Sequence, residues 1–243
     1  MDRQVLETRA MTPEVKRQIV SWIVQAALGF VGYSVVLFLS VGRLDWVWGW
    51  VFLGLLAAIL ISHVLILVPI NPKLLAERSK GICQEDAKGW DKWIAMFAAG
   101  MGTGVSWIVA SLDVRFGWSA SVPLALHIGG LVGSILGWAL FMWAMGANAF
   151  FSEAVRIQEE RGHTVQTGGP YRFVRHPGYV GAILALLAMP LLLGSLWALI
   201  PAELAAIGYV VRTALEDRTL QEELDGYEEY ARQTRYRLLP GIW

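Results

Sequence analysis

Charged residues are scarce in this chain: Asp, Glu, Lys and Arg make up 16% of the 243 residues, against about 25% in a typical soluble domain. The single cysteine, Cys83, excludes an internal disulfide, and we expect a free thiol in a cytoplasmic loop. The net charge is zero and no lysine-rich block occurs, so nothing indicates nucleic acid as a partner. The first 18 residues lack an apolar core with a cleavage site, so we expect no removable signal peptide. Together with 56% hydrophobic residues, these features exclude an ordinary soluble domain and indicate an integral membrane protein.

Long uncharged runs account for this composition. Four of them, 19–41, 46–70, 93–112 and 121–151, are each long enough to cross the hydrocarbon layer as a helix. A fifth run, 178–211, has 34 residues and would span about 51 Å as one helix. Pro190, Gly194 and Pro201 instead predict two short helices with a turn near 193–196. We therefore expect an all-α polytopic membrane protein with about six transmembrane helices, the last two forming a short hairpin.

The positions of the basic residues support six crossings. With six, 18 of the 20 lysines and arginines lie on one side, and only Arg43 and Arg115 lie on the other. Because cytoplasmic loops retain positive charge, both termini are expected in the cytoplasm.

The chain is expected to form a single domain, because no fixed repeat or flexible linker divides it. Residues 1–155 would form a transmembrane scaffold and residues 156–243 the catalytic, cofactor-binding part. Within the scaffold, glycines 100 and 104 and glycines 129, 133 and 137 are spaced for close helix packing. After residue 211, leucines and tyrosines recur among charged residues and predict an amphipathic cytoplasmic helix that continues the last span to about Arg235.

Three polar motifs lie next to the predicted hairpin. They are His163-Thr164-Val165-Gln166 with Gly169-Pro170-Tyr171, then Arg175-His176-Pro177-Gly178-Tyr179, and finally Arg212-Thr213-Ala214-Leu215-Glu216. The hairpin would return the last motif to the side of the membrane where the second begins. Because Pro177 restricts the residue before it and Gly178 allows close backbone approach, this turn is suited to contact a ligand.

In this order, the motifs resemble those of the isoprenylcysteine carboxyl methyltransferase family and of the wider group that includes phospholipid methyltransferases. The resemblance covers roughly residues 161–239 and implies a membrane enzyme that uses S-adenosylmethionine. It is to a bacterial-type member of the family, so the bacterial inner membrane is the expected location. It implies that the cofactor is bound by His163, Thr164, Val165, Gln166, Tyr171, His176, Pro177, Gly178, Tyr179 and Glu216, and that Arg212 faces the acceptor as the catalytic residue. No metal is expected.

The residue chemistry is consistent with this resemblance. Glu216 would face the cationic groups of the cofactor, and Arg212 could bind a carboxylate acceptor through two hydrogen bonds. An ionised carboxylate needs no general base before it attacks the methyl carbon, so positioning is the main task of the protein. We expect an O-methyltransferase acting on a lipophilic acid, such as an isoprenylcysteine-like compound, that enters from the bilayer.

Several alternatives remain. The acceptor could be an amine, as in a phospholipid N-methyltransferase, or the enzyme could be a nicotinamide-dependent reductase of the sterol type. A non-enzymatic transporter or scaffold is the alternative of another class. Among polar residues in the spans, His63 and His127 are expected to bond between helices, Glu203 to make a structural hydrogen bond, and Asn148 is a further candidate for the cofactor site.

Overall fold

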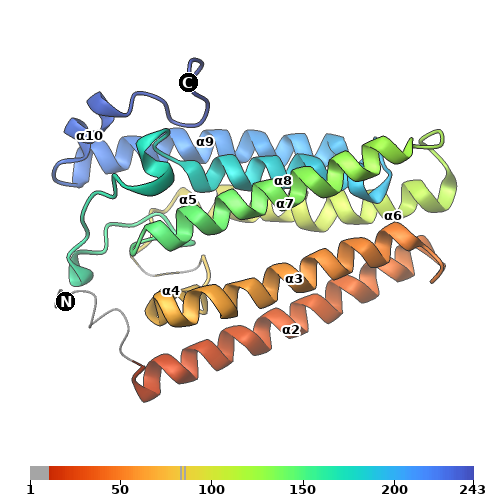
Figure 1. The fold of residues 1–243 in the computed structure, drawn as a ribbon, viewed down its shortest axis with the longest axis horizontal. Helices are drawn as coiled ribbons and strands as arrows, with labels where there is room; N and C mark the ends of the chain where they lie inside the picture. The colour runs from red at the N-terminus through yellow and green to blue at the C-terminus, as the bar shows by residue number, and fades with distance from the viewer. Residues whose placement is uncertain (1–10, 83, 85) are drawn as a thin grey trace.

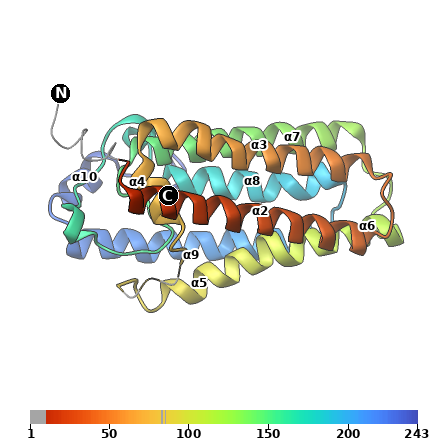
Figure 2. The ribbon, with the colours of Figure 1, turned by 90° about the horizontal axis from the view of Figure 1, so that it is seen from below.

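The computed structural model describes residues 11–82, 84 and 86–243, and within this part of the chain it contains helices and no strand. The long helices lie side by side along one direction (Figures 1 and 2). In chain order the elements are α2 (Pro13–Val41), α3 (Val47–Ile70), α4 (Pro72–Arg78), α5 (Asp91–Ala99), the π-helix η1 (Gly100–Val105), α6 (Ser106–Phe116), α7 (Leu124–Ala147), the 3₁₀ turns η2 (Glu159–Arg161) and η3 (Gly169–Arg172), α8 (Pro177–Leu193), α9 (Leu199–Glu223) and α10 (Tyr227–Gln233). The predicted all-α class is confirmed.

Three residues named from the sequence, Cys83, Arg3 and Arg9, lie outside the described residues.

Four helical segments are long and apolar enough to cross a membrane: Pro13–Val41, Val47–Ile70, Asp91–Phe116 and Leu124–Ala147. They coincide with the first four predicted runs. Local signals set their ends: Thr12 accepts a hydrogen bond from the backbone of Val15, and Gly42 adopts a left-handed conformation (φ 71°) after α2. The third segment contains the π-helical turn η1, so it is one continuous span made of three helical pieces.

The fifth run forms the predicted hairpin of two helices. α8 ends at Leu193, Gly194 takes a left-handed conformation (φ 81°), and α9 begins at Leu199. The two helices run side by side in opposite directions (Figures 1 and 2). At the turn, Ser195 donates a hydrogen bond of 2.5 Å to the buried carboxylate of Asp113 in α6. The hairpin is thereby attached to the third long helical segment.

The two hairpin helices differ in apolar length. α8 has 17 residues, or about 26 Å, and α9 is apolar only in its first half, so neither is among the four long apolar segments. The count of six crossings is therefore not established by helix length and composition.

The polar end of the chain differs from the prediction of one continuous amphipathic helix. The helix stops at Glu223, and Gly226 with φ 82° reverses the chain before the short helix α10. Tyr230 of α10 donates a hydrogen bond of 2.6 Å to the carbonyl of Tyr171. The amphipathic pattern thus belongs to two helices, because a glycine in the left-handed region allows the second to fold back onto the loop before α8.

Glycines allow α7 and α8 to pack very closely. Some of these glycines were predicted from their spacing and others were not. A Cβ atom on Gly137 would lie 2.6 Å from backbone atoms of α8, and one on Gly181 would lie 2.5 Å from the carbonyl of Gly137. Gly133 also contacts α8, whereas Gly129 faces open space and its neighbour Gly130 makes the close approach. Glycines 100 and 104 likewise face open space. Spacing alone did not reveal which face of each helix meets its partner.

Candidate active site

A cavity of about 310 Å³ lies at the end of the bundle where α7 ends and α8 begins. Its walls come from the loop between α7 and α8, the start of α8, the polar half of α9, α10, and the ends of α4 and α5. This volume lies within the range of small-molecule sites. Residues from both predicted parts of the chain, 1–155 and 156–243, therefore form one chamber.

The cavity brings together nearly all the residues named from the sequence. Those that line it are His163, Thr164, Val165, Gln166, Tyr171, His176, Gly178, Tyr179, Arg212 and Glu216. Pro177 does not line it. Pro177 is the buried first residue of α8, where its missing N–H is not needed by the helix. Its contribution is therefore to begin the helix rather than to form the wall.

Tyr179 and Glu216 join the two helices of the hairpin. The hydroxyl of Tyr179 donates a hydrogen bond to Oε2 of Glu216. The return of the Arg212–Glu216 turn to the side of His176 and Tyr179 is thus confirmed. Because Glu216 accepts no other hydrogen bond from the described residues, its carboxylate retains capacity for a cationic ligand.

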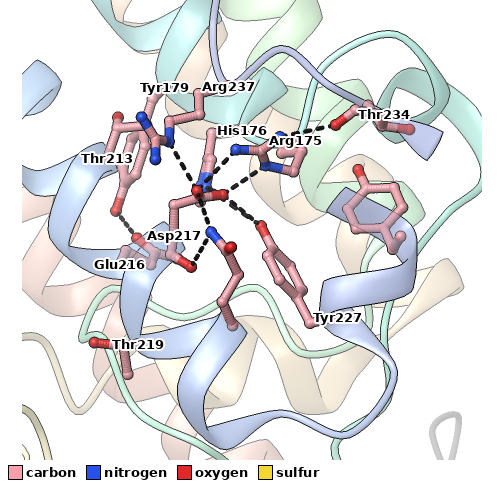
Figure 3. A network of polar contacts seen from close by, with 12 residues as sticks. Arg175, His176, Tyr179, Thr213, Glu216, Asp217, Thr219, Tyr227, Thr234 and Arg237 are labelled. Atoms are coloured by element: carbon pink, nitrogen blue, oxygen red, sulfur yellow. Dashed lines mark hydrogen bonds and ion pairs between the residues drawn. The ribbon is translucent and has the colours of Figure 1, made fainter. Parts of the chain in front are cut away.

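Asp217, which was not predicted as a site residue, is the centre of a buried polar network (Figure 3). The side chain has no solvent exposure, and it accepts two hydrogen bonds from Arg175, at 2.6 and 2.8 Å. Further donors are His176 at 3.2 Å, Tyr227 at 3.0 Å, Gln221 at 2.8 Å and Arg237 at 2.7 Å.

The donors around Asp217 keep its carboxyl group ionised. Burial alone raises the pKa of Asp217, but the hydrogen bonds from His176, Arg175 and Arg237 outweigh it and hold the pKa of this carboxyl well below its usual range. Because an ionised carboxylate only accepts, Nε2 of His176 carries a proton and donates. Asp217 thus sets the orientation of three residues of the cavity wall: Arg175, His176 and Tyr227.

Arg212 is held by a second buried carboxylate, that of Asp91 at the start of α5. Nε of Arg212 donates to Oδ1 of Asp91 at 2.6 Å, and Nη2 donates to Oδ2 at 3.0 Å. Nη2 also donates to the carbonyl of Glu153 at 2.5 Å. The predicted two-pronged grip on an acceptor is therefore not available to Arg212 alone, because Nε and Nη2 are occupied and only Nη1 makes no hydrogen bond with a described residue.

His163 is a neutral donor toward the cavity. Its Nδ1 accepts a hydrogen bond of 3.3 Å from the backbone N–H of Gln158, so in the neutral ring the proton lies on Nε2. Partial burial and the positive charges of Arg161 and Arg156 lower the pKa of His163 to about 4. At neutral pH this residue therefore offers an N–H group without a positive charge.

Two aromatic residues shape the wall near α8. Tyr171 is buried, its hydroxyl accepts a hydrogen bond of 3.3 Å from Asn148, and burial raises the pKa of its phenol well above the usual value. The close approach predicted for Gly178 is made by the ring of Phe151, since a Cβ atom would lie 2.8 Å from it. Asn148 and Phe151 also line the cavity, so both contacts shape the site.

The site residues that the sequence did not reveal include Arg78, Glu153, Tyr227 and Tyr230, which line the cavity. They also include Asp91, which does not line the cavity but binds Arg212. Each lies outside the recognised motifs, in an N-terminal segment, in the loop after α7 or in the separate helix α10. The only available signal was the position of charged residues directly beside apolar runs, as for Asp91 before the run 93–112.

The other polar residues singled out in the spans, His63, His127 and Glu203, lie outside the cavity. His127 forms a hydrogen bond of 2.8 Å with the carbonyl of Leu192, as expected between helices, whereas His63 bonds to Ile59 of its own helix. Glu203 is exposed on α9 and makes no hydrogen bond with a described residue, so the predicted structural hydrogen bond is not formed. No group of three or more potential metal ligands occurs among the described residues.

Comparison with known proteins shows that part of this site is similar to a known family. Residues 130–222 match the profile of the Isoprenylcysteine carboxyl methyltransferase (ICMT) family, and no curated protein gives a match. The matched segment contains α8 and nearly all of α9, both with their site residues. This confirms the resemblance inferred from the motifs: residues 130–222 match the isoprenylcysteine carboxyl methyltransferase family.

Proposed function

We propose that this membrane protein is an S-adenosylmethionine-dependent methyltransferase that acts on the carboxylate of a lipophilic acceptor. The observation that carries the proposal is the single cavity, in which residues of all the recognised motifs share a wall with apolar side chains of the helical bundle. The match of residues 130–222 to a methyltransferase family supports the reaction class.

The donor set of the cavity fits the cofactor. S-adenosylmethionine carries a positively charged sulfonium and amino group, a carboxylate, and an adenosine with several hydrogen-bonding atoms. Glu216 would face the positive groups, because its carboxylate is bound only by Tyr179 among the described residues. The N–H of His163 and the side chains of Thr164 and Gln166 would serve the remaining polar atoms.

The apolar part of the wall supports a lipophilic acceptor. Ala95 and Ala99 of α5 and Phe141 of α7 line the cavity. Ala99 is exposed and has exposed neighbours in Met96 and Phe97, so the cavity reaches a surface that would face lipid. We propose that the acceptor enters from the bilayer through this side, while the cofactor enters from the cytoplasm.

When bound, S-adenosylmethionine supplies a methyl group attached to a sulfonium that leaves as a neutral thioether. A carboxylate oxygen of the acceptor would take up this methyl group, and the electron pair of the broken sulfur–carbon bond would stay on sulfur. The protein has to hold the acid in line with this bond and exclude water, which can lower the barrier by roughly 7 to 11 kcal/mol. Arg212, fixed by Asp91, would hold the acid, whereas a protonated amine would be repelled by it.

The orientation in the membrane is part of the proposal. Six crossings, with α8 and α9 as the short hairpin, would place both termini in the cytoplasm and the cavity at the cytoplasmic surface of a bacterial inner membrane. The distribution of lysine and arginine supports this arrangement.

Titration of the purified protein with S-adenosylmethionine tests the function. Saturable binding is expected, and Arg212→Ala should abolish methyl transfer while leaving cofactor affinity within a few fold. The absence of binding at millimolar cofactor would refute the proposal. Saturable binding of NADPH in its place would select the reductase alternative, and binding of neither would favour a transporter or scaffold.

A further inference from the structure

Arg78 is a cavity residue that the family motifs do not include. It ends α4, a helix anchored by the fully buried Leu74 and Leu75 and capped by Asn71, and it lies well before the segment 130–222. Its side chain lines the cavity and is 14% exposed. The helix thus holds a cation in the wall of the site.

The hydrogen-bonding groups of Arg78 are largely unused. Nη2 pairs with Oε1 of Glu153 at 2.9 Å, and Nη1 contacts the thioether of Met145 at 3.7 Å, which is a weak acceptor. Nε is buried and has no hydrogen-bond partner among the described residues. Nε of Arg156, on the same cavity, is unpaired too within the described part of the chain, but the terminal nitrogens of Arg156 pair with three carboxylates, those of Glu77, Asp86 and Glu160. Arg78 therefore retains more capacity for an anionic ligand than Arg156 does.

Arg212 has a similar spare group. Asp91 and the carbonyl of Glu153 occupy its Nε and Nη2, while Nη1 forms no hydrogen bond with any residue that the structure describes. A carboxylate that binds only through Nη1 would leave one oxygen in need of a second donor.

Glu153 places the two arginines next to each other. Its carboxylate binds Arg78, and its backbone carbonyl binds Arg212. Beside them, the guanidinium of Arg78 lies 5.9 Å from the centre of the Phe141 ring, which is part of the apolar wall. Two cations and an apolar surface thus converge within one cavity.

We propose that Arg78 and Arg212 together bind the acid group of the acceptor, and that Arg78 selects an amphiphile with a terminal carboxylate over one with an alcohol or an amine. This inference rests on the proposed function, because it assigns the acceptor group of the same reaction. The alkyl part of the acceptor lies along Phe141, Ala95 and Ala99.

Binding of three probes with the same alkyl chain tests the assignment. Dodecanoate, dodecanol and dodecylamine are titrated into the full-length protein in nanodiscs, and their dissociation constants are compared. The wild-type protein is expected to bind dodecanoate at least tenfold more tightly than the other two. Arg78→Gln should weaken dodecanoate binding about tenfold and leave dodecanol binding unchanged, because the alcohol does not need the second cation.

Two further variants keep the result interpretable. Arg78→Met combined with Glu153→Gln removes both members of the buried pair, so no unpaired charge remains to destabilise the fold. Arg232→Gln removes an exposed arginine of α10 and should change nothing. Each variant is also titrated with S-adenosylmethionine, which reports separately on the proposed function and on folding.

The outcomes separate the two proposals. Retained cofactor binding with loss of the acid preference in the double variant supports the role of Arg78. The role of Arg78 is overturned if the double variant prefers the acid as strongly as wild type does. It is also overturned if the wild-type protein binds cofactor but shows no preference for the acid. A wild-type protein that binds no cofactor refutes the function instead.

Discussion

The hydroxyl of Tyr179, at the start of α8, donates a hydrogen bond to the carboxylate of Glu216 in α9. The two residues are 37 positions apart in sequence, and the hairpin turn at Gly194 is what brings them together. The recognised motifs therefore depend on a fold in which the chain leaves and returns to the same end of the bundle.

Glu216→Gln should weaken binding of S-adenosylmethionine by about tenfold or more, because the proposed charged partner of the cofactor is replaced by a neutral one. Tyr179→Phe should have a smaller effect, since it removes only the hydrogen bond that orients Glu216. Isothermal titration gives both dissociation constants. Tyr33→Phe is the control, because Tyr33 is an exposed residue of α2, and this variant should bind the cofactor like wild type. An unchanged dissociation constant in Glu216→Gln would remove this residue from the site.

Asp91→Asn should separate catalysis from cofactor binding. Loss of the carboxylate frees the guanidinium of Arg212, so kcat is expected to fall at least tenfold while the dissociation constant of S-adenosylmethionine stays within a few fold. Asp91→Glu should restore part of the rate if charge is what matters. Asp45→Asn, in an exposed pair with Arg43, serves as the control. Equal loss of rate and cofactor affinity would mean that Asp91 holds the whole site rather than Arg212.

The helical class, the four long segments and the hairpin turn could be predicted because each depends on local chemistry. Uncharged length predicts a span, and proline and glycine predict the turn at Gly194. The break at Gly226 was missed because a single glycine in a helical pattern can be tolerated, and only its left-handed conformation shows that the chain reverses there.

The candidate site was predicted where motif residues cluster and missed where distant segments meet. Arg78 and Asp91 lie more than 50 residues before the first motif, and no local pattern indicates that α4 and α5 end at the same cavity. Asp217 lies next to the predicted Glu216, but helix geometry turns adjacent side chains about 100° apart. One therefore faces the cavity and the other the buried network.

Asp217→Ala is expected to destabilise the protein by about 3 to 5 kcal/mol, because it leaves the buried Arg175 without its charged partner. Thermal unfolding in detergent, followed by circular dichroism, measures the change. The matched control is Glu222→Ala, which removes an exposed carboxylate paired with Arg218 on the same helix and should shift stability by less than about 1 kcal/mol. Similar melting temperatures for the two variants would show that the network contributes little.

Gly178→Ala should narrow the cavity without unfolding the protein. The added Cβ would lie 2.8 and 2.9 Å from two atoms of the Phe151 ring, so the ring has to move, and it forms part of the wall. We expect cofactor affinity to fall severalfold and a second change, Phe151→Leu, to restore much of it. Gly146→Ala, where nothing lies within 4 Å, is the control. Wild-type affinity in Gly178→Ala would show that the ring moves away from the ligand.

His163 should make stability depend on pH in a defined window. Its pKa is about 4 in the folded protein, against about 6.5 for an exposed histidine. The unfolded chain therefore binds the proton more readily. The stabilisation is fully present above about pH 6.5 and is lost progressively as the pH falls toward 4. In His163→Gln, whose side-chain oxygen can still accept from the backbone of Gln158, the melting temperature should vary less across this window.

Asp217 also has a lowered pKa in the folded protein, so it too contributes stability that is lost on acidification. This loss begins only near pH 4, and it is the same in wild type and in His163→Gln. Melting curves of wild type and variant that run parallel between pH 6.5 and 4 would show that His163 is protonated equally in the folded and unfolded states.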